Sequence, residues 1–181
     1  MKGTKATVRY AKALIDLSAG QGNLEEVCED MKLIYNTCAS NKELLLLLNS
    51  PIIKTDKKQN ILKKLFGGKI SNISELFILF LTTKRRESLI KSIAGEFVKQ
   101  YKKQKKILTA VITTASGLDE ELRKKILKIL KNNTGTDAEI ELIEKINTSI
   151  IGGFVLQVDD NRIDASIAKQ IKKLVMTFNK N

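Results

Sequence analysis

The chain has 181 residues, with 32 basic and 20 acidic side chains, so its formal net charge is +12. Hydrophobic residues make up 43% of it, which predicts a folded protein of one domain or two small ones. Histidine is absent, and this excludes catalytic sites of the Ser-His-Asp and Cys-His types as well as histidine-ligated metal sites.

Residues 1–106 are predicted to form six helices, because apolar residues recur there at spacings of three and four. In the first helix, the expected apolar stripe comprises Tyr10, Leu14 and Leu17. The second helix carries Cys28 and Cys38 on its apolar stripe. A helix separates these two by about 15 Å, too far for a disulfide, so we expect two buried, reduced thiols.

Short polar and glycine signals predict where the helices begin and end. Helix ends are expected at Gly20 with Gly22, at Asn49-Ser50-Pro51 and at Gly67-Gly68. The candidate N-terminal caps are Asn23, Ser40, Thr55 or Asp56, Ser71 or Ser74, Ser116 or Asp119, and Asp164. Residues 76–81 read Leu-Phe-Ile-Leu-Phe-Leu, apolar on all sides of the fifth helix, so we expect this helix to be buried in the middle of a bundle.

The pattern changes after residue 106. Residues 107–115 are rich in β-branched side chains and are predicted to form a strand, followed by a helix through Ile126 and Leu130. Further strands are expected at 138–142 and 154–158, the latter with a turn at Asp159-Asp160-Asn161 and a short return through Ile163. The apolar face of the last helix comprises Ile167, Ile171, Leu174, Val175 and Phe178. The predicted fold class is mainly α, an N-terminal six-helix bundle followed by a small α+β C-terminal domain.

The positive charge is concentrated in the first half of the chain. Residues 1–106 carry a net charge of +11 and residues 107–181 a net charge of +1. This shift, together with the basic run from Lys102 to Lys106, predicts two domains, 1–106 and 107–181. Nucleic-acid binding is one interpretation of the basic half, although few aromatic residues are available for base stacking. A solvated basic face, or attraction to an acidic protein partner, is the other.

Two short motifs allow a functional interpretation beside a structural one. In the first helix, small residues such as Ala13 fit either internal packing or a groove that receives a partner helix. Gly152-Gly153 inside an apolar run permits a close backbone approach, within the fold or toward a partner. No phosphate-binding loop motif is present, and Asp159-Asp160 fits a polar turn better than a catalytic carboxylate pair.

Three stretches of the sequence together resemble one known family. They are Arg9-Tyr10-Ala11-Lys12-Ala13-Leu14, Asn49-Ser50-Pro51, and residues 149–166, which begin Ser-Ile-Ile-Gly-Gly-Phe and end Asn-Arg-Ile-Asp-Ala-Ser. The family is that of the delta subunit of bacterial F-type ATP synthase, equivalent to the mitochondrial oligomycin sensitivity-conferring protein. The chain differs from the family pattern at Glu87, where the family has Leu, and at Ala165, where it has Gly. Ala165 implies that a positive φ is not required there.

The resemblance implies a non-catalytic subunit of the peripheral stalk, without a cofactor or a metal. The N-terminal domain would hold the N-terminal helix of an alpha subunit in a groove between its first and fifth helices. Carried over to this sequence, the groove residues are Arg9, Tyr10, Ala13, Leu14, Leu17, Phe77, Phe80 and Leu81. The C-terminal domain would bind the end of the b subunit, and the matching residues are Gly152, Gly153 and Phe154.

The resemblance also implies where the chain works. It would be present as one copy in a hetero-oligomeric ATP synthase complex, at the cytoplasmic face of the bacterial plasma membrane. Contact with the membrane would be made only through the partner subunits, and nucleic acid would not be a partner.

Overall fold

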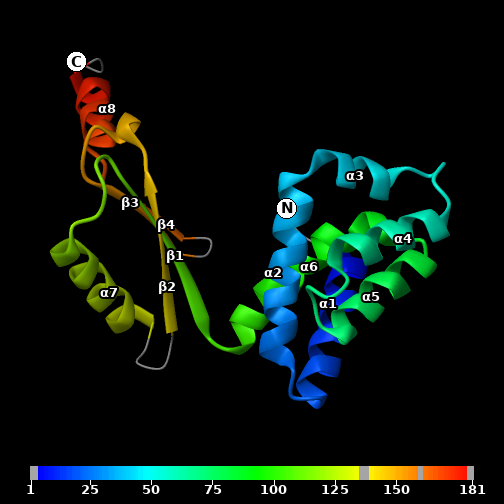
Figure 1. Cartoon of the computed structure of the whole chain (residues 1–181). Coiled ribbons are helices and arrows are strands. Elements are labelled where there is room, and N and C mark those ends of the chain that lie inside the picture. The colour runs from blue at the N-terminus through cyan, green and yellow to red at the C-terminus, as the bar shows by residue number, and fades with distance from the viewer. Residues whose placement is uncertain (1–3, 135–138, 159–160, 179–181) are drawn as a thin grey trace. The chain divides into compact units, whose positions relative to one another are not determined.

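The computed structural model describes residues 4–134, 139–158 and 161–178. The chain divides into unit 1, Met1–Lys102, and unit 2, Lys103–Asn181, each with a hydrophobic core of its own. Figure 1 shows helices throughout unit 1 and the strands in unit 2. The predicted fold class is confirmed at the level of a mainly helical chain with a small four-stranded sheet.

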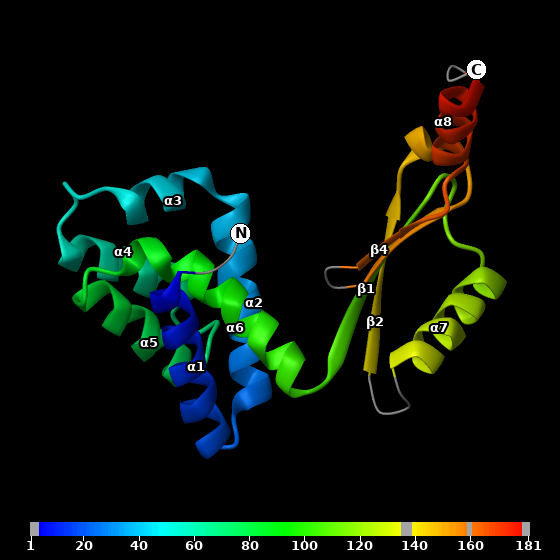
Figure 2. The same cartoon turned by 180° about the vertical axis from the view of Figure 1, so that it is seen from behind.

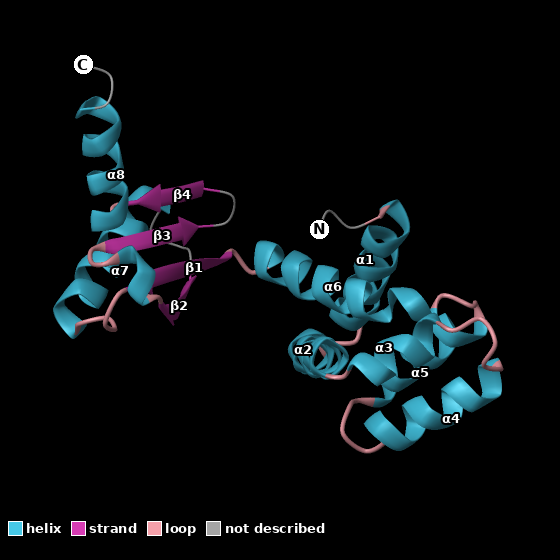
Figure 3. Ribbon diagram, turned by 90° about the horizontal axis from the view of Figure 1, so that it is seen from above, coloured by secondary structure: helices cyan, strands magenta, loops and turns pink. Residues whose placement is uncertain are grey.

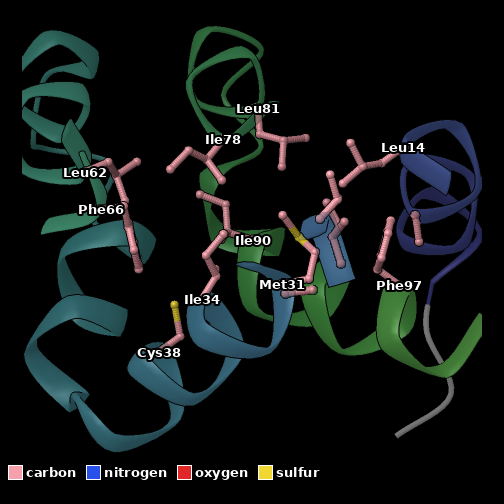
Figure 4. Close-up of a cluster of buried hydrophobic side chains, with 14 of the residues drawn as sticks. Leu14, Met31, Ile34, Cys38, Leu62, Phe66, Ile78, Leu81, Ile90 and Phe97 are labelled. Atoms are coloured by element: carbon pink, nitrogen blue, oxygen red, sulfur yellow. The ribbon is translucent and has the colours of Figure 1, made fainter. Parts of the chain in front are cut away.

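Helices pack around a common core in unit 1, as the views from opposite sides in Figures 1 and 2 show. They are α1 (Lys5–Gly20), α2 (Leu24–Ser40), α3 (Lys42–Asn49), α4 (Thr55–Phe66), α5 (Asn72–Thr83) and α6 (Ile90–Gln104), with a 3-10 turn η1 (Glu87–Leu89) before α6. Figure 4 shows side chains from α1, α2, α4, α5 and α6 pointing into this core, among them Leu14, Met31, Phe66, Leu81 and Phe97. Full burial of such a side chain contributes about 1.5–3 kcal/mol.

Helix α1 buries a different face from the expected stripe of Tyr10, Leu14 and Leu17. Its buried residues are Thr7, Ala11, Leu14, Ile15 and Ser18. The Ser18 hydroxyl donates to the Leu14 carbonyl oxygen at 2.7 Å, so this polar side chain is satisfied inside the core. Tyr10 is half-buried and Leu17 is 49% exposed, so two of the three stripe residues lie at the surface.

The prediction that residues 76–81 are buried on all sides is wrong. Ile78 and Leu81 are buried, whereas Leu76 and Phe80 are exposed. The reason is that α5 packs on one side, where it contacts α2 and α4. Leu76 and Phe80 are four residues apart and therefore share one face of α5, which is apolar and open to solvent.

Three N-terminal caps in unit 1 are made by polar side chains, and the first is Thr4, whose hydroxyl accepts from the Thr7 amide at 3.3 Å at the start of α1. Ser71 caps α5, as predicted, and its hydroxyl accepts a hydrogen bond from the Ser74 amide at 3.4 Å. The cap of α3 is Asn41 and not Ser40, because Asn41 Oδ1 accepts from the Leu44 amide at 3.1 Å. Ser40 is the last residue of α2, so the predicted capping box of Ser40 with Glu43 is wrong and the cap lies one residue later.

The caps predicted for α2 and α4 are not made. Asn23 stands at the N-cap position of α2, but its side chain forms no capping hydrogen bond. Lys54 occupies the N-cap position of α4, so Thr55 and Asp56 lie inside the helix and cap nothing. Asp56 instead places a negative charge in the first turn, where the helix dipole favours it.

Two buried polar contacts join helices that are distant in sequence. Asp30 of α2 lies before the N-terminus of α5, where its Oδ2 accepts from the Ser71 amide at 2.9 Å and from the Ser71 hydroxyl at 2.6 Å. Lys58 of α4 is buried, and its Nζ donates to Glu87 Oε1 at 2.5 Å and to the Leu48 carbonyl oxygen at 3.0 Å. These contacts connect α2 to α5, and α4 to both α3 and η1.

We predict that neither cysteine of the native protein reacts with Ellman's reagent within minutes at pH 8. Cys28 and Cys38 are both free and buried, as expected. Burial raises the pKa of the Cys28 thiol, and it raises the pKa of Cys38 to about 11. The reactive thiolate is therefore scarce as well as inaccessible. Both thiols should react at once in guanidinium chloride, and rapid reaction of either thiol in the native chain would contradict the burial.

The sheet of unit 2 has the strand order β2-β1-β3-β4 (Figure 3). Its strands are β1 (Ile107–Thr114), β2 (Glu139–Ile146), β3 (Phe154–Val158) and β4 (Asn161–Asp164), with the helices α7 (Glu120–Thr134) and α8 (Ile167–Phe178) and a 3-10 turn η2 (Thr148–Ile150). β1 and β2 run parallel with α7 as the crossover between them, and the other pairs are antiparallel. The turn predicted at Asp159-Asp160 lies outside the described residues.

Helix α7 covers one face of this sheet. Ile126 and Leu130 of α7 pack with Ala110, Ile112 and Leu156 of the strands to form the core of unit 2. The alternation along β1, in which Ala110, Ile112 and Thr114 are buried, is that of a strand with one covered face. Helix α8 lies beyond the end of the sheet and contacts η2 (Figures 1 and 2).

Of the two glycines before β3, Gly153 is required by the fold itself, whereas Gly152 lies against the end of a side chain. Gly153 has a φ of +73°, and a Cβ there would lie 2.4 Å from the Ala165 carbonyl oxygen. A Cβ on Gly152 would lie 2.7 Å from Ile167 Cδ1. The close backbone approach inferred from these glycines is therefore made by the start of α8. Ala165 is not among the residues of positive φ, as its departure from the family pattern implied.

Ser166, and not Asp164, caps α8. The Ser166 hydroxyl accepts from the Lys169 amide at 3.2 Å, and Asp164 Oδ1 accepts from the Ser166 hydroxyl at 2.7 Å and from its amide at 3.2 Å. Asp164 therefore does not cap α8 itself. It orients Ser166, the residue that does.

We predict that Ser166→Ala raises the pKa of Asp164. The hydroxyl of Ser166, and then its amide, hold the pKa of Asp164 below the usual value of 3.8. A carboxylate with a lowered pKa stabilises the fold above its unfolded pKa, and this stability is lost as the pH falls through the folded value. Carboxyl NMR titration should show the pKa of Asp164 returning only partly toward 3.8, because the hydrogen bond from the backbone amide of residue 166 remains. An unchanged midpoint would contradict the role of the hydroxyl.

Candidate partner-binding surfaces

The candidate functional features of this chain are exposed apolar surfaces. Among the residues that the structure describes, no group of three or more His, Cys, Asp and Glu could hold a metal ion. Within the same residues, no helix combines the length and the apolar character needed to cross a membrane. A hollow of about 690 Å³ lies beside η1 and the loop between α3 and α4, and none of the residues predicted for partner binding lines it.

The first candidate surface lies on α1 and α5. We call it the α1/α5 surface, and its members are Tyr10, Ala13, Leu17, Leu76, Phe77 and Phe80. Ala13, Leu17, Leu76 and Phe80 are exposed, while Tyr10 and Phe77 are half-buried against the core. The members from each helix recur at spacings of three or four, so they share one face of it. Exposed apolar side chains that share a helix face in this way are typical of a surface that binds another protein.

Leu14 and Leu81 do not belong to this surface, although both were predicted to line the groove. They are 2% and 0% exposed and belong to the core of unit 1, and Figure 4 shows both pointing into it. Their contribution is to hold α1 and α5 on a common core. A partner on the surface would not touch them.

Positive charges accompany the aromatic side chains of the α1/α5 surface. The Arg9 guanidinium lies 5.9 Å from the centre of the Tyr10 ring, and Lys84 Nζ lies 5.7 Å from the centre of the Phe80 ring. Both distances are typical of cation–π contacts. Arg9 thus stays beside the predicted site, at its rim. An apolar surface with a basic rim fits a helix that has an apolar face and acidic flanks.

Sequence reasoning missed Leu76, which lies one turn before Phe80. The signal was present, because the two residues are four apart in a helix. It was obscured by the apolar residues on every side of this segment, which predicted burial without indicating which face would stay open.

The residues predicted in unit 2 lie close together but have internal partners. The Gly152 carbonyl oxygen accepts from the Ile167 amide at 3.0 Å, and the Phe154 carbonyl oxygen accepts from the Ala165 amide at 3.0 Å. The Phe154 side chain is half-buried against the core of unit 2. Gly152, Gly153 and Phe154 therefore join β3 to the start of α8. In α8 itself the exposed apolar side chains are Ile167, Ile171, Leu174, Val175 and Met176.

Comparisons with known proteins agree along nearly the whole chain. Residues 6–178 match the family model described as ATP synthase delta (OSCP) subunit. The chain is 38% identical to the ATP synthase subunit delta of Cytophaga hutchinsonii over 178 residues, which cover 98% of this chain and 96% of that protein. It is 34% identical to the subunit delta of Prochlorococcus marinus over 174 residues, covering 96% of each.

A solved structure shares the fold. A chain of the Toxoplasma gondii mitochondrial ATP synthase hexamer superimposes with a TM-score of 0.72 at 23% sequence identity, covering 97% of this chain and 98% of that one. At this identity the match concerns the fold alone. It includes both units, since almost the whole of each chain is covered.

Proposed function

Because the chain belongs to the ATP synthase delta (OSCP) subunit family, it is a non-catalytic stator subunit of an F-type ATP synthase, and we propose that its two units hold two different partners. The observation that carries this conclusion is the family match over residues 6–178. Nucleic-acid binding, the alternative interpretation of the basic first half, finds no support in the comparisons.

The role is mechanical. Proton-driven rotation of the central shaft exerts torque on the catalytic head, and ATP synthesis requires that the head does not turn with it. A stator subunit resists this torque through its contacts with the head on one side and with the stalk on the other. Its contribution to catalysis is therefore the strength of two interfaces, and not a chemical step.

Unit 1, in this proposal, binds the N-terminal helix of an alpha subunit at the α1/α5 surface. Tyr10, Ala13 and Leu17 would contact it from α1, and Phe77 and Phe80 from α5. Apolar side chains in the centre supply most of the affinity of such a contact. The basic rim, with Arg9 and Lys84, would steer an acidic helix and fix its orientation. The six helices of unit 1 would form the scaffold that holds the two contacting helices in place.

Unit 2 binds the end of the b subunit in this proposal, close to Gly152, Gly153 and Phe154. The support is the resemblance of residues 149–166 to the family motif, together with the exposed apolar side chains of the adjacent α8. We place the complex at the cytoplasmic face of a bacterial plasma membrane, with one copy of the chain in each complex. The chain would then reach the membrane only through the b subunit.

Titration of the intact chain with two probes tests the proposal. The probes are the N-terminal peptide of the alpha subunit and the C-terminal fragment of the b subunit, both from the same organism. Calorimetry should give one site for each, and saturation with one should leave the other site free. An alpha peptide that does not bind would refute the role of unit 1, and competition between the probes would refute the division of roles.

A further inference from the structure

The hollow beside η1 is a candidate site of another kind, separate from the α1/α5 surface. One of its walls is the segment from Leu48 to Asp56, and the other is formed by Arg85, Glu87 and Ser88. Its volume of about 690 Å³ lies within the range of ~300–1,000 Å³ that is typical of pockets for small molecules. The hollow therefore has the size of a ligand site, and the side chains that line it indicate the chemistry of the ligand.

A buried ion pair holds the two walls together. The side chain of Lys58 lines the hollow and is 3% exposed. Its Nζ donates to the Leu48 carbonyl oxygen of one wall at 3.0 Å and to Glu87 Oε1 of the other. These contacts are made within the chain, so the hollow is formed before a ligand arrives, and preformed sites bind at a lower cost. The charges of Lys58 and Glu87 compensate each other.

Each wall carries one further cation. Lys54 and Arg85 both line the hollow and are exposed, and neither forms an ion pair with another residue that the structure describes. One further carboxylate, that of Asp56, stands against these two cations. The hydroxyl groups of Ser50 and Ser88 line the hollow as well and are available as hydrogen-bond donors. The charges and donors of this lining therefore favour an anion.

The backbone of Arg85 provides an independent observation. Helix α5 ends in a Schellman motif, in which the Arg86 amide donates to the Leu81 carbonyl oxygen at 2.8 Å and the Arg85 amide to that of Thr82 at 3.0 Å. The position of Arg85 in this motif is usually glycine, because its φ is positive, here +54°. Strained residues of this kind gather at ligand-binding sites, and the guanidinium group suits phosphate better than any other side chain does.

We propose that the hollow binds a soluble organic phosphate, with Lys54 from one wall and Arg85 from the other holding the phosphate group. A phosphate monoester carries up to two negative charges, so it matches two cations better than a carboxylate does. Apolar contacts for the organic part come from Pro51, Ile52 and Ile53 of the first wall. The strained arginine is retained, in this proposal, because its side chain contacts the ligand.

An NMR titration of the intact chain with adenosine 5′-monophosphate tests the site. The amide signals of residues 48–56 and 85–88 should shift along one saturable curve, whereas adenosine, which lacks the phosphate, should shift none of them. Inorganic phosphate should act on the same residues but bind at least fivefold more weakly, because it makes no apolar contacts. No saturable shift at millimolar concentrations would overturn the proposal. Shifts spread over the exposed lysines of unit 1 would also overturn it, since they would show only general attraction to a basic surface.

Substitutions in the lining should change the affinity in opposite directions. Lys54→Gln should weaken binding at least fivefold, whereas Asp56→Asn should strengthen it, because it removes a carboxylate from the lining. Lys64→Gln is the matched control for the first: Lys64 is an exposed lysine of the same helix that does not line the hollow, so the affinity should stay within twofold. Equal losses in Lys54→Gln and Lys64→Gln would overturn the assignment to the hollow.

Arg85→Gly gives two readouts of opposite sign. The thermal midpoint of unit 1 should rise, because the strain at this positive φ is relieved, while the affinity for adenosine 5′-monophosphate should fall at least fivefold. A variant that binds like the unaltered chain would overturn the role of the arginine. Vesicles of phosphatidylglycerol distinguish a lipid headgroup from a soluble ligand, and the chain should not sediment with them more than with phosphatidylcholine. Sedimentation that is abolished by Lys54→Gln would overturn the choice of a soluble phosphate.

Discussion

Phe80→Asp should weaken binding of the alpha-subunit peptide by about 30-fold or more. Phe80 is an aromatic side chain that is 46% exposed on the α1/α5 surface, with Lys84 over its ring. Truncating a central aromatic anchor of an interface typically costs ~2–4 kcal/mol, and the new carboxylate would also be desolvated in the complex. Calorimetric titration of the intact chain with the peptide measures the loss.

The position of Phe80 makes this a test of binding and not of folding. Its side chain is open to solvent, so the circular dichroism spectrum and the unfolding midpoint should change little. Leu14→Asp would be a poor test, because Leu14 is buried and a charge there would unfold unit 1. Leu46→Asp, an exposed site outside the α1/α5 surface, is the matched control. If Phe80→Asp binds the peptide as tightly as the unaltered chain, the α1/α5 surface is not the alpha-subunit site.

Local patterns in the sequence predict the elements of this fold well. The strand predicted at 154–158 is β3 with the same limits, and the helix ends at Asn49-Ser50-Pro51 and Gly67-Gly68 are where the breaking residues stand. These features depend on neighbours in the chain: a β-branched run, a proline, or a glycine of positive φ such as Gly68. Such signals need no knowledge of the tertiary structure.

The failures concern features that tertiary structure decides. Nothing local in residues 76–81 distinguishes the buried Leu81 from the exposed Phe80, because both are apolar and the choice is made by the helices packed on one side. Asp30 reads as one of several acidic residues in α2, yet across 41 positions of sequence it accepts hydrogen bonds from Ser71, the residue that caps α5. A hydrophobic pattern with a period of 3.6 predicts a helix with an apolar face. Where apolar residues lie on every side, tertiary packing decides which face is covered.

The candidate site was predictable in part for the same reason. The family resemblance predicted that the first and fifth helices form the alpha-subunit site. Of the residues named for it, Tyr10, Leu17 and Phe80 are at the surface, where a partner can reach them. Gly152 and Gly153 were read correctly as positions of close backbone approach. Sequence alone could not show that the approaching segment is the start of α8, and the exposed stripe of α8 was read only as an apolar face.

Lys58→Met should destabilise unit 1 by ~3–5 kcal/mol. The Lys58 side chain is 3% exposed, and the substitution leaves Glu87, whose side chain is 13% exposed, without its ion-pair partner and the Leu48 carbonyl oxygen without its donor. Glu87 Oε2 is already buried without a hydrogen bond, so this oxygen offers no contact that would compensate for the loss of Lys58. Urea unfolding followed by near-UV circular dichroism measures unit 1 selectively, because Tyr10, Tyr35 and Tyr101 all lie in it.

The double variant Lys58→Met with Glu87→Leu separates the loss of attraction from the cost of a stranded charge. It removes both charges and restores at position 87 the leucine of the family pattern. Because replacing a buried ion pair by apolar residues of similar size is often neutral, the double variant should recover most of the lost stability. Glu87→Leu alone should be as damaging as Lys58→Met, since it strands the buried ammonium group. A double variant no more stable than either single one would show that the pair itself, and not the avoidance of an unpaired charge, holds α3, α4 and η1 together.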